Sequence, residues 1–202
     1  MKPKGSTLPE VFIIETLDPD DEGNGRFEGS ILSRMLRLHG KNPKYRYVRT
    51  RNQFRAAVAQ FGRSRYRYLH ISCHANSESM RTTNQDDIEF KKLAAILRPH
   101  LRNRRLFLSA CDMVNDNLAR QVLPSTGCYS IIGPDEDVRF TDAAVLWASL
   151  YHLMFTRSPS VMKHPELLRV LGDTSKLFSV SMSYFSKSKN RRKGYKRNFL
   201  KR

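Results

Sequence analysis

The sequence predicts a three-layer α/β domain, in which a mostly parallel central sheet of about six strands carries helices on both faces. Two observations predict this class. Short apolar runs typical of buried strands alternate with longer segments whose apolar residues recur at helical spacing. The 202-residue chain is 40% hydrophobic and 27% charged, as expected for a domain that buries one core without disulfides. We find no internal repeat, and we expect one domain over residues 1–186 followed by a tail over 187–202.

The first half of the chain begins with a strand and a helix. Residues 11–14 form an apolar run bounded by Pro9, which predicts a buried strand. Residues 28–39 are predicted to be helical because Leu32, Met35 and Leu36 recur at helical spacing. A strand over 45–48, a helix over 52–61, a strand over 66–73 and a polar loop over 76–85 follow. Residues 82–88 suit a small hairpin.

The second half repeats the alternation. A helix is predicted over 90–101, although Pro99 lies near its end, and Pro124 closes a shorter helix over 116–123. The other predicted elements are strands over 105–110, 128–132 and 179–185 and helices over 141–155 and 164–177. Strands separated by helices of this length predict βαβ units.

The charge of the chain is concentrated at its end. The formal net charge is +17, and residues 187–202 contain nine Lys or Arg and no acid. Such a segment repels itself and offers little apolar surface, so we expect a disordered tail. It is expected either to attract nucleic acid or another polyanion, or only to keep the protein in solution.

The cysteine count and the terminal sequence indicate a compartment. Three cysteines do not suggest a disulfide framework. There is no apolar run of eighteen residues for a membrane span, and the N-terminus lacks the features of a secretory signal. We therefore expect a cytoplasmic protein with reduced thiols and no cofactor.

Two of the predicted strands end in reactive side chains. His74 follows the strand over 66–73, and Cys111 follows the strand over 105–110. Neighbouring parallel strands release their carboxyl ends at one edge of a sheet, so the imidazole and the thiol are expected to lie close together. A thiol beside a base is a nucleophile. The backbone N–H groups of Ala75 and Asp112 would hold the oxyanion that forms after attack.

The two motifs, His74 at the end of one strand and Leu108-Ser-Ala-Cys111 at the end of the next, resemble those of the caspase-like cysteine peptidases. The resemblance is strongest to the CHAT-type branch and continues through Tyr129-Ser-Ile-Ile-Gly133 and the helix that begins near Asp142. Three positions differ from the family patterns: Ala75 replaces the usual glycine after the histidine, and Ser109 and Met113 replace the glutamine and the glycine of the caspase motif.

The resemblance implies the caspase-like fold and a cysteine endopeptidase in which His74 is the general base and Cys111 the nucleophile. It also implies a protein or peptide substrate, activation by a partner protein, and a role in bacterial antiviral defence. A competing hypothesis is a non-catalytic adaptor or nucleic-acid-binding module on the same scaffold, which uses the basic surface and tail.

The sequence also contains acidic clusters and further possible metal ligands. Residues after the strand over 128–132 are expected to line a substrate pocket that selects a basic side chain: Asp135, Glu136, Asp137 and, as an alternate, Asp142. A second acidic cluster follows the first predicted strand and consists of Asp18, Asp20, Asp21 and Glu22. It is interpreted as part of a solvated loop, and the alternative is a Mg²⁺ site. A zinc site is disfavoured because, on one strand, Cys73 points away from the face shared by His70 and His74. We therefore expect no metal, and we expect Cys73 and Cys128 in the core.

Overall fold

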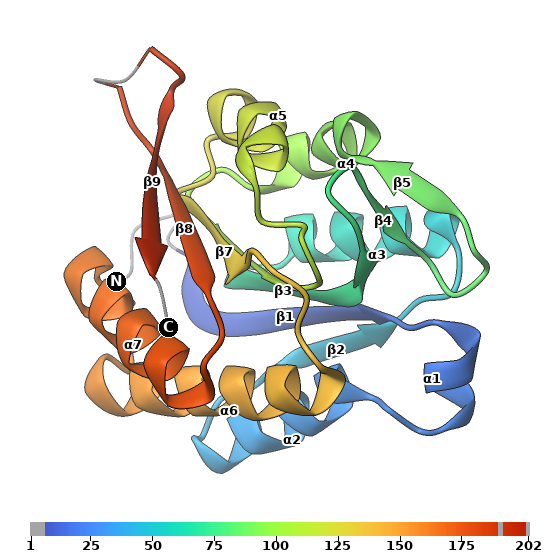
Figure 1. Cartoon of the computed structure of the whole chain (residues 1–202), viewed down its shortest axis with the longest axis horizontal. Coiled ribbons are helices and arrows are strands. Elements are labelled where there is room, and N and C mark those ends of the chain that lie inside the picture. Colours follow the sequence, from blue (N-terminus) through green and yellow to red (C-terminus); the bar gives the residue numbers. More distant parts are fainter. Residues whose placement is uncertain (1–6, 190–191, 201–202) are drawn as a thin grey trace.

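The central sheet has the strand order β2-β1-β3-β6-β7-β8-β9 (Figure 1). The computed structural model describes residues 7–189 and 192–200. The strands of this path are β1 (Leu8–Thr16), β2 (Lys44–Tyr47), β3 (Tyr66–Ala75), β6 (Arg105–Ser109), β7 (Ser130–Pro134), β8 (Met182–Lys187) and β9 (Tyr195–Leu200). The first five strands are parallel to one another, and β8 and β9 are antiparallel to their neighbours. A small hairpin, β4 (Ser79–Arg81) and β5 (Asp87–Glu89), pairs with the end of β3.

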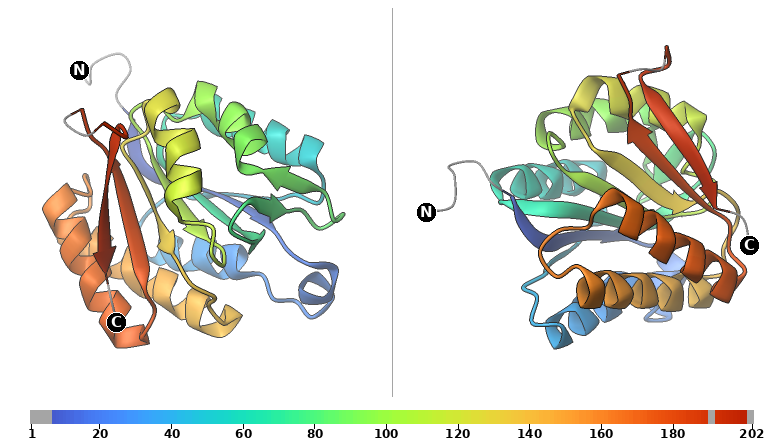
Figure 2. Two further views of the ribbon diagram at one scale, coloured as in Figure 1. Left: turned by 45° about the horizontal axis from the view of Figure 1, so that its top comes forward. Right: turned by 90° about the vertical axis from the view of Figure 1, so that its left-hand side faces the viewer.

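Helices cover both faces of this sheet (Figures 1 and 2). One face carries α3 (Arg51–Arg63), α4 (Phe90–Leu97) and α5 (Asp116–Thr126), and the other carries α2 (Glu28–Leu38), α6 (Phe140–Arg157) and α7 (His164–Phe178). A short helix, α1 (Pro19–Gly23), follows β1. The predicted three-layer α/β architecture with a mostly parallel sheet is therefore confirmed.

Strand β3 shows how the sequence divides between the two faces. Leu69, Ile71 and Cys73 belong to the core under α3, α4 and α5, whereas Tyr68 belongs to the core under α2 and α6. Both faces are buried, so the strand is a nearly continuous apolar run rather than an alternating one. The prediction that Cys73 lies in the core is confirmed, and Cys128 is fully buried as well.

Two helices end at other residues than predicted, and a proline lies near each predicted end. The helix predicted over 90–101 ends at Leu97, and Pro99 lies in a following 3₁₀ turn because proline lacks the N–H that an α-helix needs. Pro124 was predicted to close the next helix, but α5 continues to Thr126. That helix ends where Gly127 adopts a left-handed conformation with φ of 73°.

The C-terminal segment differs from its prediction. Instead of a disordered tail, residues 195–200 form β9, and the predicted domain boundary at residue 186 falls inside β8. The expectation of disorder is wrong because Tyr195 is buried against the ring of Phe185, with 5.8 Å between ring centroids. This aromatic pair supplies an apolar contact that the high charge of the segment gave no reason to expect. Residues 190–191 and 201–202 lie outside the described residues.

Candidate active site

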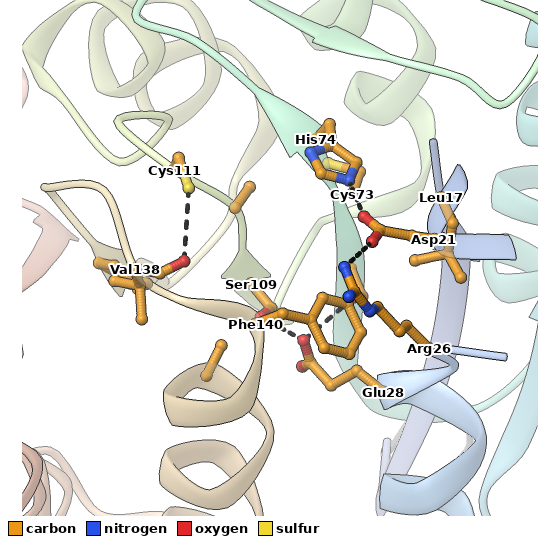
Figure 3. A pocket seen from close by; sticks show the side chains of 14 residues that line it. Leu17, Asp21, Arg26, Glu28, Cys73, His74, Ser109, Cys111, Val138 and Phe140 are labelled. Carbon is orange, nitrogen blue, oxygen red and sulfur yellow. Dashed lines mark hydrogen bonds and ion pairs between the residues drawn. The ribbon is translucent and has the colours of Figure 1, made fainter. Parts of the chain in front are cut away.

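A pocket of about 250 Å³ opens at the carboxyl edge of the parallel strands (Figure 3). His74 at the end of β3 and Cys111, two residues after β6, both line it. Further lining residues come from β3 and the end of β6, from the segment between β1 and the start of α2, and from the segment between the end of β7 and α6, among them Asp21, Glu28 and Val138. The structure thus brings the two predicted reactive side chains to one pocket.

The imidazole of His74 is held by a carboxylate. Its Nε2 lies 2.7 Å from Oδ2 of Asp21, and the histidine side chain is half exposed while that of Asp21 is 12% exposed. Arg26 donates to the other oxygen of Asp21, also at 2.7 Å. Burial acts to raise the pKa of Asp21, but the hydrogen bonds from Arg26 and His74 outweigh it, and the pKa is lowered. Asp21 is therefore an anion beside the imidazole at neutral pH.

The thiol of Cys111 does not contact that imidazole. Its Sγ lies 3.8 Å from the carbonyl oxygen of Val138, in the loop between β7 and α6, and within the described residues no hydrogen bond joins it to His74. Burial raises the pKa of the Cys111 thiol, and the negative charges of Asp137 and Asp112 add to the effect. In this arrangement the sulfur is a protonated thiol on the opposite side of the pocket from the base (Figure 3).

The backbone next to His74 and Cys111 carries the two N–H groups that are predicted to hold an oxyanion. In the β3–β4 ladder, Asn76 donates to Ser79, so the preceding pair, Ala75 and Met80, is the non-hydrogen-bonded kind. The N–H of Ala75 therefore points away from β4. Asp112, directly after the cysteine, has φ of 50°, a left-handed conformation that costs energy for a residue other than glycine.

A buried carboxylate forms the inner end of the pocket. Glu28, in the first turn of α2, is 3% exposed and accepts hydrogen bonds from Ser109 at 2.8 Å and Ser72 at 3.3 Å through Oε2. Its other oxygen, Oε1, has no hydrogen-bond partner among the described residues and lies 3.5 Å from Nε2 of the fully buried His70. His70 in turn contacts Tyr151 of α6 at 3.2 Å.

The four acids predicted to line a substrate pocket lie in the loop between β7 and α6 and in the first turn of α6. Asp135 accepts hydrogen bonds from Ser183 and Arg197 of the β8–β9 hairpin, and Glu136 accepts from the backbone of Ser181. Asp142 pairs with a neighbouring arginine at the start of α6. Asp137 is exposed beside Cys111. None of the four belongs to the lining of this pocket.

Sequence reasoning missed the two carboxylates that do line the pocket. Asp21 was one of four acids interpreted as a loop, and the cap that Asp18 places on α1 turns it inward. Glu28 is the first residue of a predicted helix, a position where acidic residues are common whatever their function. A signal existed for both, since each follows β1 at the same sheet edge as His74.

Within residues 7–189 and 192–200, no three His, Cys, Asp or Glu side chains are grouped to hold a metal ion. In the same ranges, the helices are too short or too polar to cross a membrane.

The mixed α/β fold, with a mostly parallel central sheet between helical layers, matches the caspase-like fold of solved C11 cysteine proteases. One similar solved structure is iotapain, a secreted C11 cysteine protease from Bacteroides thetaiotaomicron, with a TM-score of 0.62, 11% identity, and coverage of 90% of this chain and 66% of that one. A second, a secreted C11 cysteine protease from the same organism in complex with an irreversible peptide inhibitor, has a TM-score of 0.62, 10% identity, and coverage of 88% and 66%.

At such identities the likeness establishes the fold, and this chain spans just under two thirds of the length of those proteases. No family model matches the sequence, and no curated protein does.

Proposed function

We propose that this protein is a cysteine endopeptidase in which Cys111 is the nucleophile and His74 the general base. The observation that carries the proposal is a free thiol and a carboxylate-bound imidazole lining one pocket at the carboxyl edge of the sheet. The shared fold with cysteine proteases supports it. The sequence motif around Cys111 further favours the CHAT-type branch and a role in bacterial defence.

Asp21 defines which ring nitrogen acts. Because its carboxylate can only accept, Nε2 of His74 carries the proton, and Nδ1 keeps the free lone pair. Nδ1 takes the proton of the Cys111 thiol, and Asp21 stabilises the imidazolium that forms. The thiolate then attacks the peptide carbonyl carbon.

The intermediate collapses with the help of the same groups. The N–H groups of Ala75 and Asp112 donate to the oxyanion, and the imidazolium returns its proton to the leaving amine. A thioester between the substrate acyl group and Cys111 remains. Water, deprotonated by His74, attacks this thioester and releases the acid product and the free thiol.

The resting geometry favours a latent enzyme. The thiol bonds to the carbonyl of Val138 instead of His74, so catalysis requires the sulfur to turn towards the imidazole or the loop between β7 and α6 to move. A partner protein that shifts this loop is therefore part of the proposal.

The charge of the pocket indicates the side chain before the scissile bond. Asp21 and Glu28 line it, while Arg26 is engaged by Asp21 at the mouth. The two carboxylates suit a lysine or arginine side chain, because a cationic ligand compensates the charge of a carboxylate held in a partly buried pocket.

The test is cleavage of a peptide library, and of proteins encoded beside this one, by the wild type and by Cys111→Ala and His74→Ala. Cleavage by the wild type alone is expected. His152→Ala, which changes an exposed histidine on α6 far along the chain, serves as the matched control and should leave cleavage unchanged. Equal cleavage by wild type and Cys111→Ala would exclude the proposal.

The adaptor hypothesis has one observation in its favour, the exposed cations of the β8–β9 hairpin. A peptide carrying a thiol-reactive electrophile separates the two functions. An enzyme should be labelled at Cys111 in preference to the buried Cys73 and Cys128, whose pKa values are raised by burial, that of Cys128 to about 12. Because Cys111 is also the least buried of the three thiols, the comparison is repeated with His74→Ala, which should slow the labelling of an enzyme and leave that of a non-catalytic module unchanged.

A further inference from the structure

The β8–β9 hairpin projects beyond the helices that surround it (Figures 1 and 2). Its described and exposed cations are Lys187, Lys189, Arg192, Lys193 and Lys196. Within the described ranges, only Lys193 of these five forms an ion pair, at 3.9 Å from Asp116. No acid occurs from residue 187 to the last residue of the sequence. The hairpin is therefore a cationic ribbon whose charges face solvent.

The shape of this ribbon selects among anionic partners. β8 pairs with β7 as far as Ser186, so only the part of the hairpin beyond that residue is a two-stranded ribbon. The major groove of B-form DNA, about 12 Å wide, admits a two-stranded antiparallel ribbon, and lysine and arginine side chains on such a ribbon reach the flanking phosphates. The major groove of A-form RNA is too deep and narrow to admit it. The net charge of +17 adds long-range attraction to a polyanion.

One arginine of the hairpin is bound to both segments that surround Cys111. Arg197 on β9 donates to Asp135 at 2.8 Å and lies 3.5 Å from Asp116. Asp116 begins α5, directly after the turn that carries Cys111. Asp135 begins the loop whose Val138 carbonyl holds the thiol. The side chain of Asp135 is 5% exposed and that of Arg197 is 34% exposed, so this contact is partly open to solvent. It holds the loop together with the hydrogen bonds from Ser183 to Asp135 and from Ser181 to Glu136.

We infer that the β8–β9 hairpin binds duplex DNA and that phosphates, by competing with Asp116 and Asp135 for Arg197, release the loop over 135–139 from Cys111. The binding surface is independent of any activity, and the coupling rests on the proposed function of Cys111. Duplex DNA would then be the signal that converts the latent thiol into one that can turn towards His74.

Binding is measured by fluorescence anisotropy of the full-length protein with a labelled 20-base-pair DNA over a range of salt concentrations. The triple variant Lys187→Gln/Lys189→Gln/Lys196→Gln should flatten the slope of log affinity against log salt by about 2.7, about 0.9 for each lost phosphate contact. A matched variant removes three exposed cations near α4: Lys91→Gln/Lys92→Gln/Arg98→Gln. It should leave the slope unchanged.

Three results would overturn the binding surface. These are an equal loss in the matched variant, tighter binding to duplex RNA, or equally effective competition by polyglutamate at the same charge. The last result would instead identify an acidic protein as the partner.

Coupling is measured as the alkylation rate of Cys111 by iodoacetamide, which reports exposure of the thiol and not peptide cleavage. DNA should raise this rate about tenfold, the effect expected from loss of one hydrogen bond between charged groups. Arg197→Gln should reach the faster rate without DNA and show no further response, and Asp116→Asn should move in the same direction. The matched variant Lys91→Gln/Lys92→Gln/Arg98→Gln, whose exposed cations lie outside the hairpin, should keep the response.

The readouts separate the two proposals. A DNA-dependent alkylation rate without peptide cleavage would contradict the peptidase and leave the coupling standing. DNA binding without any change in alkylation would overturn the coupling, and melting curves of each variant establish that the fold is intact.

Discussion

Asp21 is expected to determine how well His74 acts as a base, and its replacement by asparagine tests this directly. The hydrogen bond between them is short, at 2.7 Å, and joins a carboxylate to an imidazole that becomes charged during the reaction. Hydrogen bonds to charged groups contribute about 1.5–3 kcal/mol. The His74 side chain is 50% exposed, so water replaces part of the lost bond, and about 1–2 kcal/mol remains.

This energy corresponds to a decrease of about 5- to 30-fold in the rate at which a peptide electrophile inactivates the enzyme through Cys111. Asp20→Asn, an exposed carboxylate in the same short helix, is the matched control and should react at the wild-type rate. Arg26→Gln removes the competing cation from Asp21 and should increase the rate. If Asp21→Asn and Asp20→Asn react equally fast, the reasoning is refuted.

Three further changes test the fold around the site. Gly133→Ala would place a methyl group 2.3 Å from the backbone oxygen of Leu108, so urea denaturation should show a loss of about 1–3 kcal/mol in the free energy of unfolding. Burial raises the pKa of Glu15 from 4.5 to about 7. The free energy of unfolding of the wild type should therefore fall by up to about 3 kcal/mol as the pH rises between these two pKa values, at about 1.4 kcal/mol per pH unit. Urea denaturation at a series of pH values should show no such fall for Glu15→Gln. Glu89→Gln, an exposed change, should behave like the wild type. Arg104→Met removes three hydrogen bonds, of 2.7, 3.2 and 2.7 Å, to carbonyls at the end of α3 and should cost about 3 kcal/mol in urea denaturation.

The sequence was sufficient to predict the layers and the edge of the sheet where the reactive side chains lie. Buried parallel strands leave continuous apolar runs, and the residue that follows each run marks a carboxyl end. His74 and Cys111 were found in this way. Their side-chain orientation was not, because the contact between the thiol and Val138 joins segments 27 residues apart and has no local signature.

The carboxylates of the pocket show the same limit. Asp21 stands among three other acids, and only the fold of α1 distinguishes the one that meets His74. The prediction of a disordered C-terminal segment was wrong for a different reason. Its cations dominated the composition, while the single buried Tyr195 that anchors β9 is visible only once Phe185 and α5 are placed beside it.

The strand order leaves β2 and β9 as the outer strands of the sheet, each with one row of backbone groups that no neighbouring strand in the described structure occupies. Both strands expose cations, Lys44 and Arg46 on the first and Lys196 and Arg197 on the second. Like charges on sheet edges oppose the addition of a strand from a second molecule. Concentrated solutions of the protein should therefore stay dispersed at low ionic strength and associate edge to edge as salt weakens this repulsion.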